Sequence, residues 1–461
     1  MNWFRRSLRQ LLARIASLGG LRTVLTSAAL VFAIRMTGAA ITYASMVFLA
    51  RWLGAFEFGI YAYITVLVTL LGLGLSCGFN SSSLRFVSDY LARGKWGRVT
   101  GFFIESYGVV VVVSVTGALI GAGLIVALRG VIEPYFYAPL LAGLLCVPVT
   151  ALLNQGEAMA RAFGRVNLAY VPGYIVRPAL LVVFVGGLVL LGRSPSAVTA
   201  VWAVIAACVV AVLGQGVLVW LEIRRRVPRV APRFHGRHWV TVSLSFLMID
   251  GFRMLLDNSD VLLIGRLLDP HNVALYFAAI RTGGLVAFVS FSMIALAVPK
   301  FAEIHVTGTR QELQTFVSGV IHLTFWPSLL TAIALAAAGP FVLSLFGKGF
   351  EAAYPAMLVI LAGLVLRSAS GPVEYLLNMT GHHRDTVRVY AVAGAATIAL
   401  NLLLIPMLGI IGAAIATYTA MLGANVWLYF LVRRRLGVSA FILPLGGGRG
   451  RRAPVAPLPA H

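Results

Sequence analysis

An apolar stretch near the middle of the chain carries four ionisable side chains. Residues 246–269 read FLMIDGFRMLLDNSDVLLIGRLLD and include Asp250, Arg253, Asp257 and Asp260. At about 100° per residue on a helix, these side chains share an arc of roughly 80°. One charge at the centre of a membrane span costs about 3 kcal/mol, so four that faced lipid would cost on the order of 10 kcal/mol. We therefore expect them to face the interior of a helical bundle or water.

Two interpretations of these charges remain open. In the first, at least one of Asp250, Asp257 and Asp260 binds substrate or a coupling proton or sodium ion. In the second, Asp250 and Asp257 only neutralise Arg253, which they flank at helical spacing, and Asp260 lies near the outer head groups.

Arginine is the only basic residue inside the apolar runs, and the five positions are Arg35, Arg177, Arg253, Arg281 and Arg367. A guanidinium keeps its charge at low dielectric and binds phosphate oxygens through two parallel hydrogen bonds. The five arginines are therefore candidates for binding an anionic head group. The alternative for each is an interhelical ion pair that positions helices. Glu374 shares a helix face of roughly 60° with Arg367 and joins the three aspartates as a candidate for ion coupling.

The elements that must position these residues are membrane-spanning helices. Of the 461 residues, 60% are hydrophobic and 11% are charged, against roughly 25% charged in ordinary globular proteins. Runs of about twenty apolar residues, each long enough to cross a bilayer as a helix, recur along the chain. They predict an all-α polytopic membrane protein with about twelve spans. Their approximate limits are 23–50, 60–84, 101–128, 135–160, 166–191, 197–221, 240–265, 273–298, 314–338, 353–379, 387–407 and 410–432.

Basic residues are distributed unevenly between the loops. With the N-terminus in the cytoplasm, 27 of the 37 Lys and Arg residues lie in cytoplasmic segments, five in outer loops and five inside spans. This asymmetry follows the positive-inside rule and predicts that both termini are cytoplasmic. The basic residues behind the net charge of +22 are therefore expected to set the topology and to contact anionic lipid. No nucleic-acid partner is expected.

A weak internal repeat divides the chain. RWLGAFEFGIY (51–61) aligns with RLLDPHNVALY (266–276) at an offset of 215, and LLN recurs at 152–154 and 376–378 at an offset of 224. The repeat predicts two six-helix bundles of the same direction with a central V-shaped cavity, where transporters place substrate. The expected parts are an interfacial amphipathic helix at 1–22, bundles at 23–223 and 240–433, a basic cytoplasmic linker at 224–239, and a mostly disordered cytoplasmic tail at 434–461.

Cysteine and histidine give no sign of a metal or cofactor. Cys77, Cys146 and Cys208 lie in apolar runs without CxxC spacing, which is typical of buried, inert thiols. The only histidine pair, at 382–383, is expected in a solvated turn. We therefore expect neither a metal site nor a cofactor.

Four stretches carry a resemblance to a known family: ARWLGAFEFGIYAY (50–63), SLRFVSDYLARGKWGRV (83–99), LDNSDVLLIGRLLDPHNVALYFAAIR (256–281) and GIIGAAIATYTA (409–420). In order and spacing the chain resembles the polysaccharide flippases of the multidrug/oligosaccharidyl-lipid/polysaccharide (MOP) superfamily. The resemblance implies a MATE-like fold and alternating access. It also implies a cargo, an oligosaccharide on polyprenyl pyrophosphate, moved to the outer leaflet of a bacterial cytoplasmic membrane for polysaccharide biosynthesis. A polysaccharide polymerase and glycosyltransferases are possible partners.

Other functions remain as alternatives. A drug or cation antiporter of the same fold would need an acidic cavity, whereas the arginines inside the spans favour an anion. A membrane-embedded glycosyltransferase or polymerase usually needs long outer loops with catalytic carboxylates or histidines, and the outer loops here are short. A scaffold without transport activity would not need charges inside the membrane.

Overall fold

Regular structure is helical throughout the part of the chain that the computed structural model describes, residues 19–442 except residues 308 and 381–382. The predicted surface helix at 1–22 and the predicted tail at 434–461 lie largely outside that part. The helices, in chain order, are α2 (Gly19–Leu75), α3 (Phe79–Ala92), α4 (Trp96–Ala127), α5 (Pro134–Ala162), α6 (Val166–Val171), η1 (Pro172–Val176), α7 (Arg177–Leu190), α8 (Ala197–Arg226), α9 (Gly236–Leu267), α10 (Pro270–Thr307), α11 (Arg310–Ser344), η2 (Phe350–Ala353), α12 (Tyr354–Ala369), α13 (Val373–Met379) and α14 (His383–Leu436).

The prediction of about twelve spans agrees with these helices. Nine helical segments of the described residues are long and apolar enough to cross a membrane. Two of them, in α2 and α14, are hairpins of two crossings, because the backbone leaves helical geometry at Gly54 (φ 74°) and Gly409 (φ 58°). Only glycine adopts a positive φ without strain, so these residues permit the reversals. Helix α10 supplies the remaining crossing.

Three crossings are interrupted near their middle or end. The second crossing breaks between α2 and α3, where Cys77 and Gly78 both have positive φ. The tenth breaks between α12 and α13 at Gly371 (φ 60°). The fifth contains the π-helix η1 just before Pro178, where proline removes a backbone donor and favours a kink. Irregular backbone at membrane depth is tolerated only where other helices or water satisfy it.

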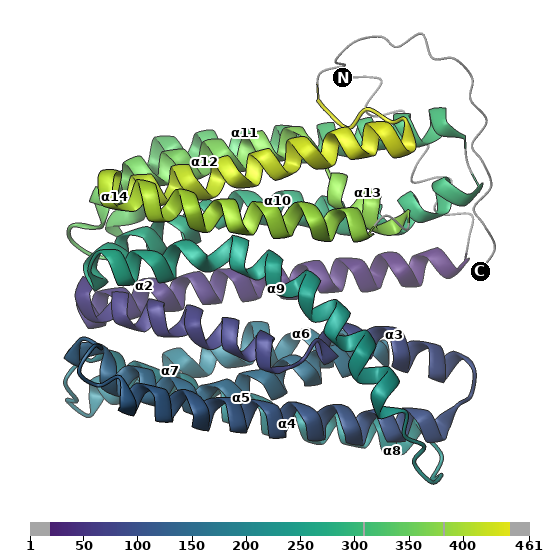
Figure 1. Ribbon diagram of the computed structural model, residues 1–461, viewed down its shortest axis with the longest axis horizontal. Coiled ribbons are helices and arrows are strands. Elements are labelled where there is room, and N and C mark those ends of the chain that lie inside the picture. The colour runs from purple at the N-terminus through teal and green to yellow at the C-terminus, as the bar shows by residue number, and fades with distance from the viewer. Residues whose placement is uncertain (1–18, 308, 381–382, 443–461) are drawn as a thin grey trace.

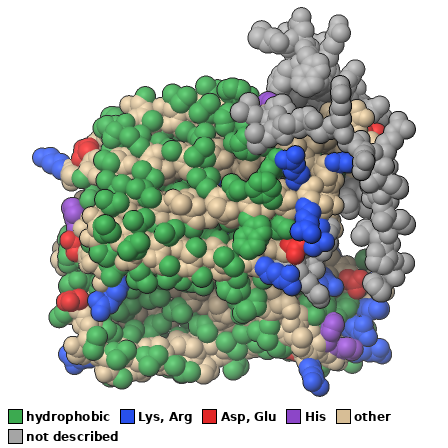
Figure 2. Space-filling model, turned by 45° about the horizontal axis from the view of Figure 1, so that its top comes forward, with side chains coloured by type: hydrophobic (Ala, Val, Ile, Leu, Met, Phe, Trp, Pro, Cys, Tyr) green, Lys and Arg blue, Asp and Glu red, His purple; other side chains and the backbone are tan. Residues whose placement is uncertain are grey.

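The two ends of the helical bundle differ in charge. We call the end with the Gly54 and Gly409 turns the hairpin end, and the opposite end the basic end, since Arg93, Arg226 and Arg435 lie there in ion pairs. A broad band of hydrophobic side chains separates the charged rims (Figure 2). Many large apolar side chains in this band are exposed, as expected of a surface that faces lipid. The chain is therefore a multi-pass membrane protein.

The helices of the first half lie on one side of the molecule and those of the second half on the other, and α9 runs obliquely between them (Figure 1). The start of α9 packs in the first half, where Trp239 is fully buried and its indole Nε1 donates a hydrogen bond of 2.9 Å to the Tyr90 hydroxyl. The rest of α9 packs against α14. Because α9 contacts both halves, the boundary expected at residue 240 stays a prediction.

The halves meet closely at the hairpin end. A Cβ atom added to Gly59 would lie 1.7 Å from the carbonyl oxygen of Pro270, so α2 and α10 are in backbone contact there. Phe58 of the first half packs among Phe277, Phe346 and Phe350 of the second, with ring centroids 6.0 to 6.4 Å away. These contacts seal the hairpin end.

At the basic end, contacts between the halves are made through α9. The Ser82 and Ser243 hydroxyls lie 2.6 Å apart, and a Cβ atom on Gly78 would lie 1.9 Å from the Ser243 carbonyl oxygen. The cavities described below lie within the halves. The V-shaped cavity between the halves stays a prediction.

Candidate functional site

The four ionisable residues of α9 enter three different surroundings. Asp250 faces the first half, where the Ser81 hydroxyl donates a hydrogen bond of 2.5 Å to it. Arg253 and Asp257 face α12 and α13, and Asp260 is buried between α10 and α14. The four side chains lie on one face of the helix, as periodicity predicted, but they do not form one site. The reason is that α9 passes from one half to the other along its length.

Arg253 is the centre of a charge cluster in the second half. Its Nη1 lies 3.1 Å from Oε1 of Glu374, and its Nε lies 3.9 Å from Oδ2 of Asp257. Arg367 comes close to Asp257 and donates a hydrogen bond of 3.4 Å to the Met421 sulfur. Two guanidinium groups thus face two carboxylates. Glu374, rather than Asp250, is the second acid that neutralises Arg253.

This cluster borders a small cavity of about 10 Å³, lined by Arg253, Leu256, Asp257, Arg367, Tyr390, Met421 and Asn425. A cavity of that size holds at most one water molecule. The cluster leaves little space on this side, while 39% of the Arg253 side chain and 41% of the Asp257 side chain are exposed.

Asp260 has a different environment, without a basic neighbour. Its side chain is 1% exposed. The Tyr276 hydroxyl donates a hydrogen bond of 2.7 Å and the Thr417 hydroxyl one of 3.2 Å to Oδ2, and the Val261 amide donates one of 2.8 Å to Oδ1. No Lys, Arg or His among the described residues forms an ion pair with Asp260. Protein covers Asp260 on all sides, and its expected position near the outer head groups stays a prediction.

Two residues connected to Asp260, through Thr417 or as its neighbour in the chain, carry buried oxygen atoms without a partner. Asn401 donates from Nδ2 to Thr417 at 3.3 Å, while its Oδ1 is buried with no hydrogen-bond partner, and the Ser259 hydroxyl is also buried without one. A carboxylate with amide and hydroxyl oxygens nearby is a ligand set for a hard cation. A proton on Asp260 is the other way to remove the buried charge.

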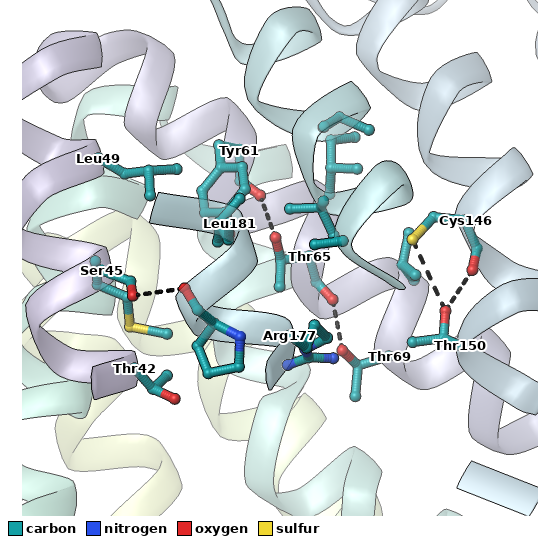
Figure 3. A pocket seen from close by; sticks show the side chains of 17 residues that line it. Thr42, Ser45, Leu49, Tyr61, Thr65, Thr69, Cys146, Thr150, Arg177 and Leu181 are labelled. Carbon is teal, nitrogen blue, oxygen red and sulfur yellow. Dashed lines mark hydrogen bonds between the residues drawn. The ribbon is translucent and has the colours of Figure 1, made fainter. Parts of the chain in front are cut away.

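Arg177 lies in a cavity of about 70 Å³ inside the first half (Figure 3). Figure 3 shows its guanidinium among Thr65, Thr69 and Thr150, whose hydroxyls donate to backbone carbonyl oxygens. The guanidinium also lies beside the sulfur of Cys208. No carboxylate of the described residues pairs with Arg177.

Arg281 lies next to a contact between the halves in the sequence. It lies 4.5 Å from the ring centroid of Phe277, and its Nε is buried without a hydrogen-bond partner. The next residue, Thr282, shares a hydrogen bond of 3.0 Å with the Tyr43 hydroxyl of the first half. Tyr61 is near both Arg281 and Arg177, so these two arginines approach a common residue from opposite halves.

Arg35 belongs to an aromatic cluster in the first half. Its guanidinium lies 5.8 Å from the ring of Tyr170 and 5.3 Å from the ring of Tyr174, and Nη2 donates to the Tyr174 hydroxyl at 3.4 Å. A Cβ atom on Gly38 would lie 2.5 Å from the Tyr174 carbonyl oxygen, so α2 and η1 are in close contact. Arg35 is positioned by these contacts.

Among the predicted residues, the structure brings Arg253, Asp257, Glu374 and Arg367 together. It does not bring all five arginines to one cavity. Tyr276, Thr417 and Asn401 were not predicted as partners of Asp260. The sequence held a signal for Asn401, because it is the one polar residue in the run IALNLLLIP (398–406). For Tyr276 and Thr417 the signal was only their position in stretches that carry the family resemblance.

The arrangement of helices is similar to that of several solved membrane transporters. The fold resembles an inward-facing multidrug resistance MATE transporter of the MOP superfamily, with a TM-score of 0.70 and 13% identity over 88% of this chain and 98% of that one. A MOP superfamily transporter from Pyrococcus furiosus, whose binding pocket is described as reversed in polarity, matches with a TM-score of 0.64 and 17% identity over 89% and 95%. The lipid II flippase MurJ, in an inward closed conformation, matches with 0.66 and 13% over 88% and 87%.

The family is given by the sequence. A family model described as polysaccharide biosynthesis protein matches residues 48–355, and the chain belongs to this family. No curated protein sequence matches the chain. The expected family is thus confirmed as a polysaccharide biosynthesis family, and the fold is similar to those of MOP superfamily transporters.

Proposed function

We propose that this protein is a flippase that moves an oligosaccharide linked to polyprenyl pyrophosphate across a bacterial cytoplasmic membrane, from the cytoplasmic to the outer leaflet. The main support is Arg281 at the junction of the halves, a partly buried arginine whose Nε is buried without a hydrogen-bond partner. An unpaired cation at membrane depth is costly unless a ligand or partner compensates it. A diphosphate supplies that compensation through two parallel hydrogen bonds. The match to a polysaccharide biosynthesis family agrees with this cargo.

Alternating access is the proposed mechanism. In the described state the hairpin end is sealed by the contacts of Gly59 and Phe58 with the second half. We propose that these contacts separate when the cargo is released. The basic end then faces the cytoplasm, because that places most Lys and Arg residues inside.

Ion coupling is proposed for the acidic residues of the second half. Asp260 is the strongest candidate, since it is buried without a basic partner and is connected through Thr417 to Asn401. A sodium ion or a proton would remove its charge. Asp257 and Glu374 are weaker candidates, because Arg253 already neutralises them, and Asp250 is weaker still because it bonds Ser81 at the basic end.

The alternative of a drug or cation antiporter is less well supported. An organic cation requires an acidic cavity, whereas Arg177 and Arg281 approach the junction of the halves without carboxylate partners. We also propose transport rather than catalysis, with the glycan lipid as cargo and a polysaccharide polymerase and glycosyltransferases as functional partners.

Export of the glycan in cells, with membrane abundance measured in parallel, tests the proposal. Arg281→Ala should reduce export severely, and Arg281→Lys only partially, because lysine keeps the charge but loses the planar fork. Arg367→Ala and Arg35→Ala test the other predicted arginines in the same assay. The matched control is Arg193→Gln, an exposed arginine beyond the end of α7. Undiminished export by Arg281→Ala at normal abundance would show that Arg281 is structural.

A further inference from the structure

The two halves of the chain contain sites at equivalent positions with opposite charge. When the two halves are aligned with the offsets of 215 and 224, Asp260 and two of its neighbours align with three residues of the site that contains Arg177. The pairs are Ser45 with Asp260, Tyr61 with Tyr276, and Arg177 with Asn401. Thus serine in the first half replaces the buried aspartate of the second, and arginine in the first half replaces its asparagine.

The contacts within each half support this equivalence. In the second half, Tyr276 and Thr417 donate to Asp260, and Asn401 donates to Thr417. In the first half, Ser45 and Tyr61 both line the cavity that contains Arg177. Each site contains residues from the first, second, fifth and sixth crossings of its own half. The residue from the sixth crossing is Cys208, which lies beside Arg177, in the first half and Thr417, which lies beside Asn401, in the second half.

No carboxylate of the described residues pairs with Arg177, whose side chain is partly buried. A cation that is partly removed from water without a counter-charge favours an anionic ligand. The Ser45 hydroxyl does not help, because it donates to the carbonyl oxygens of Ile41 and Pro178 at 2.7 and 3.2 Å. The guanidinium has five N–H donors, and the cavity beside it is open to a ligand (Figure 3).

The size of this cavity limits the ligand. It measures about 70 Å³, and one water molecule needs roughly 10–15 Å³ of such volume. The cavity therefore holds a few water molecules or one small inorganic anion. This volume favours a small anion over a sugar or a diphosphate attached to a lipid.

We propose that the first half binds one monovalent inorganic anion, such as chloride, at Arg177, in the position where the second half has its buried carboxylate. The anion stabilises the first half by neutralising Arg177. This site is separate from the proposed cargo site at Arg281. It does not depend on the identity of the cargo.

Direct binding tests the proposal with the purified full-length protein. Radiolabelled chloride should bind saturably, at one ion per chain, in the absence of any glycan lipid. Replacement of chloride by gluconate at constant sodium should lower the Tm by about 2 °C, as expected when a ligand well above its dissociation constant is removed. Absence of saturable binding by the unmodified protein would overturn the proposal.

Three variants locate the site. Arg177→Gln should abolish binding, while Arg193→Gln, at the exposed end of the same crossing, should bind like the parent. Ser45→Asp places a carboxylate in the same cavity, as in the second half, and should also abolish binding while it leaves the protein folded without chloride. Unchanged binding by folded Arg177→Gln or by Ser45→Asp would contradict the assignment.

Competition distinguishes a resident anion from the diphosphate of the cargo. Bromide should displace chloride at similar concentration, since both are small monovalent anions. Inorganic diphosphate at the same concentration should not displace it. Displacement by diphosphate would indicate that Arg177 belongs to the cargo site and would refute a separate anion site. The proposed flippase function would not be affected.

Discussion

The contact at Gly59 provides a quantitative test of how the hairpin end is closed. In Gly59→Ala the new methyl group would lie 1.7 Å from the Pro270 carbonyl oxygen, whereas ordinary contact begins at 3.4 Å. The helices α2 and α10 must therefore separate by about 1.7 Å. Overpacking of this kind costs about 1–3 kcal/mol. Because the cost applies only while the end is closed, the ratio of closed to open molecules should fall roughly five- to 150-fold.

Maleimide labelling of a buried cysteine measures this shift. Ala274 follows Pro270 on α10 and is 0% exposed, so a cysteine there, with the native cysteines replaced, should label slowly in the parent protein. Gly59→Ala should accelerate labelling by the factor given above. Gly74→Ala is the control, because a Cβ atom on Gly74 meets nothing within 4 Å and alanine favours the helix by up to about 1 kcal/mol. If folded Gly59→Ala labels at the parent rate, the contact does not control closure.

Three further predictions follow from other contacts. Glu374→Gln should destabilise the protein by about 1 kcal/mol, because Arg253 loses its nearest carboxylate but is 39% exposed and screened by solvent; adding Arg253→Gln should restore most of this in thermal unfolding, and additive losses would show that the two residues are not coupled. Tyr276→Phe removes a hydrogen-bond donor to Asp260 and should lower the free energy of unfolding by about 1.5–3 kcal/mol. An unchanged Tm would show that this hydrogen bond does not stabilise a charged Asp260. In intact cells, an impermeant maleimide should label Lys348→Cys at the hairpin end but not Val230→Cys in the basic linker; the reverse pattern would invert the proposed topology.

The number and approximate limits of the spans were predictable because a bilayer requires about twenty apolar residues for each crossing. The breaks within crossings were harder to predict. Residues 370–372 interrupt the tenth crossing, yet the run 353–379 is apolar on both sides, and an apolar count alone does not detect a local turn at Gly371. Only the π-helix before Pro178 had a clear local signal, since proline removes a backbone donor.

The partners of the charged residues were only partly predictable. Helical periodicity gives the direction of a side chain from its own axis, which is why Arg253 and Asp257 were correctly paired as neighbours. It does not say which helix lies opposite. Asp250 faces α3, and Asp260 faces Thr417, which is 157 residues away in the sequence. Such partners depend on how α9 crosses between the halves, and that is a property of the whole fold.

The packing of α9 also bears on the order in which the protein is assembled during synthesis. Trp239 completes an apolar cluster that otherwise consists of residues of the first half, including Phe86, Tyr90 and Phe102. When the ribosome has made the sixth crossing, this cluster still lacks its central side chain. The first half therefore reaches its final packing only after the seventh crossing has been inserted. A protein divided into two separately produced fragments should accordingly be cut after α9, because a cut in the 224–239 linker separates Trp239 from the helices that enclose it.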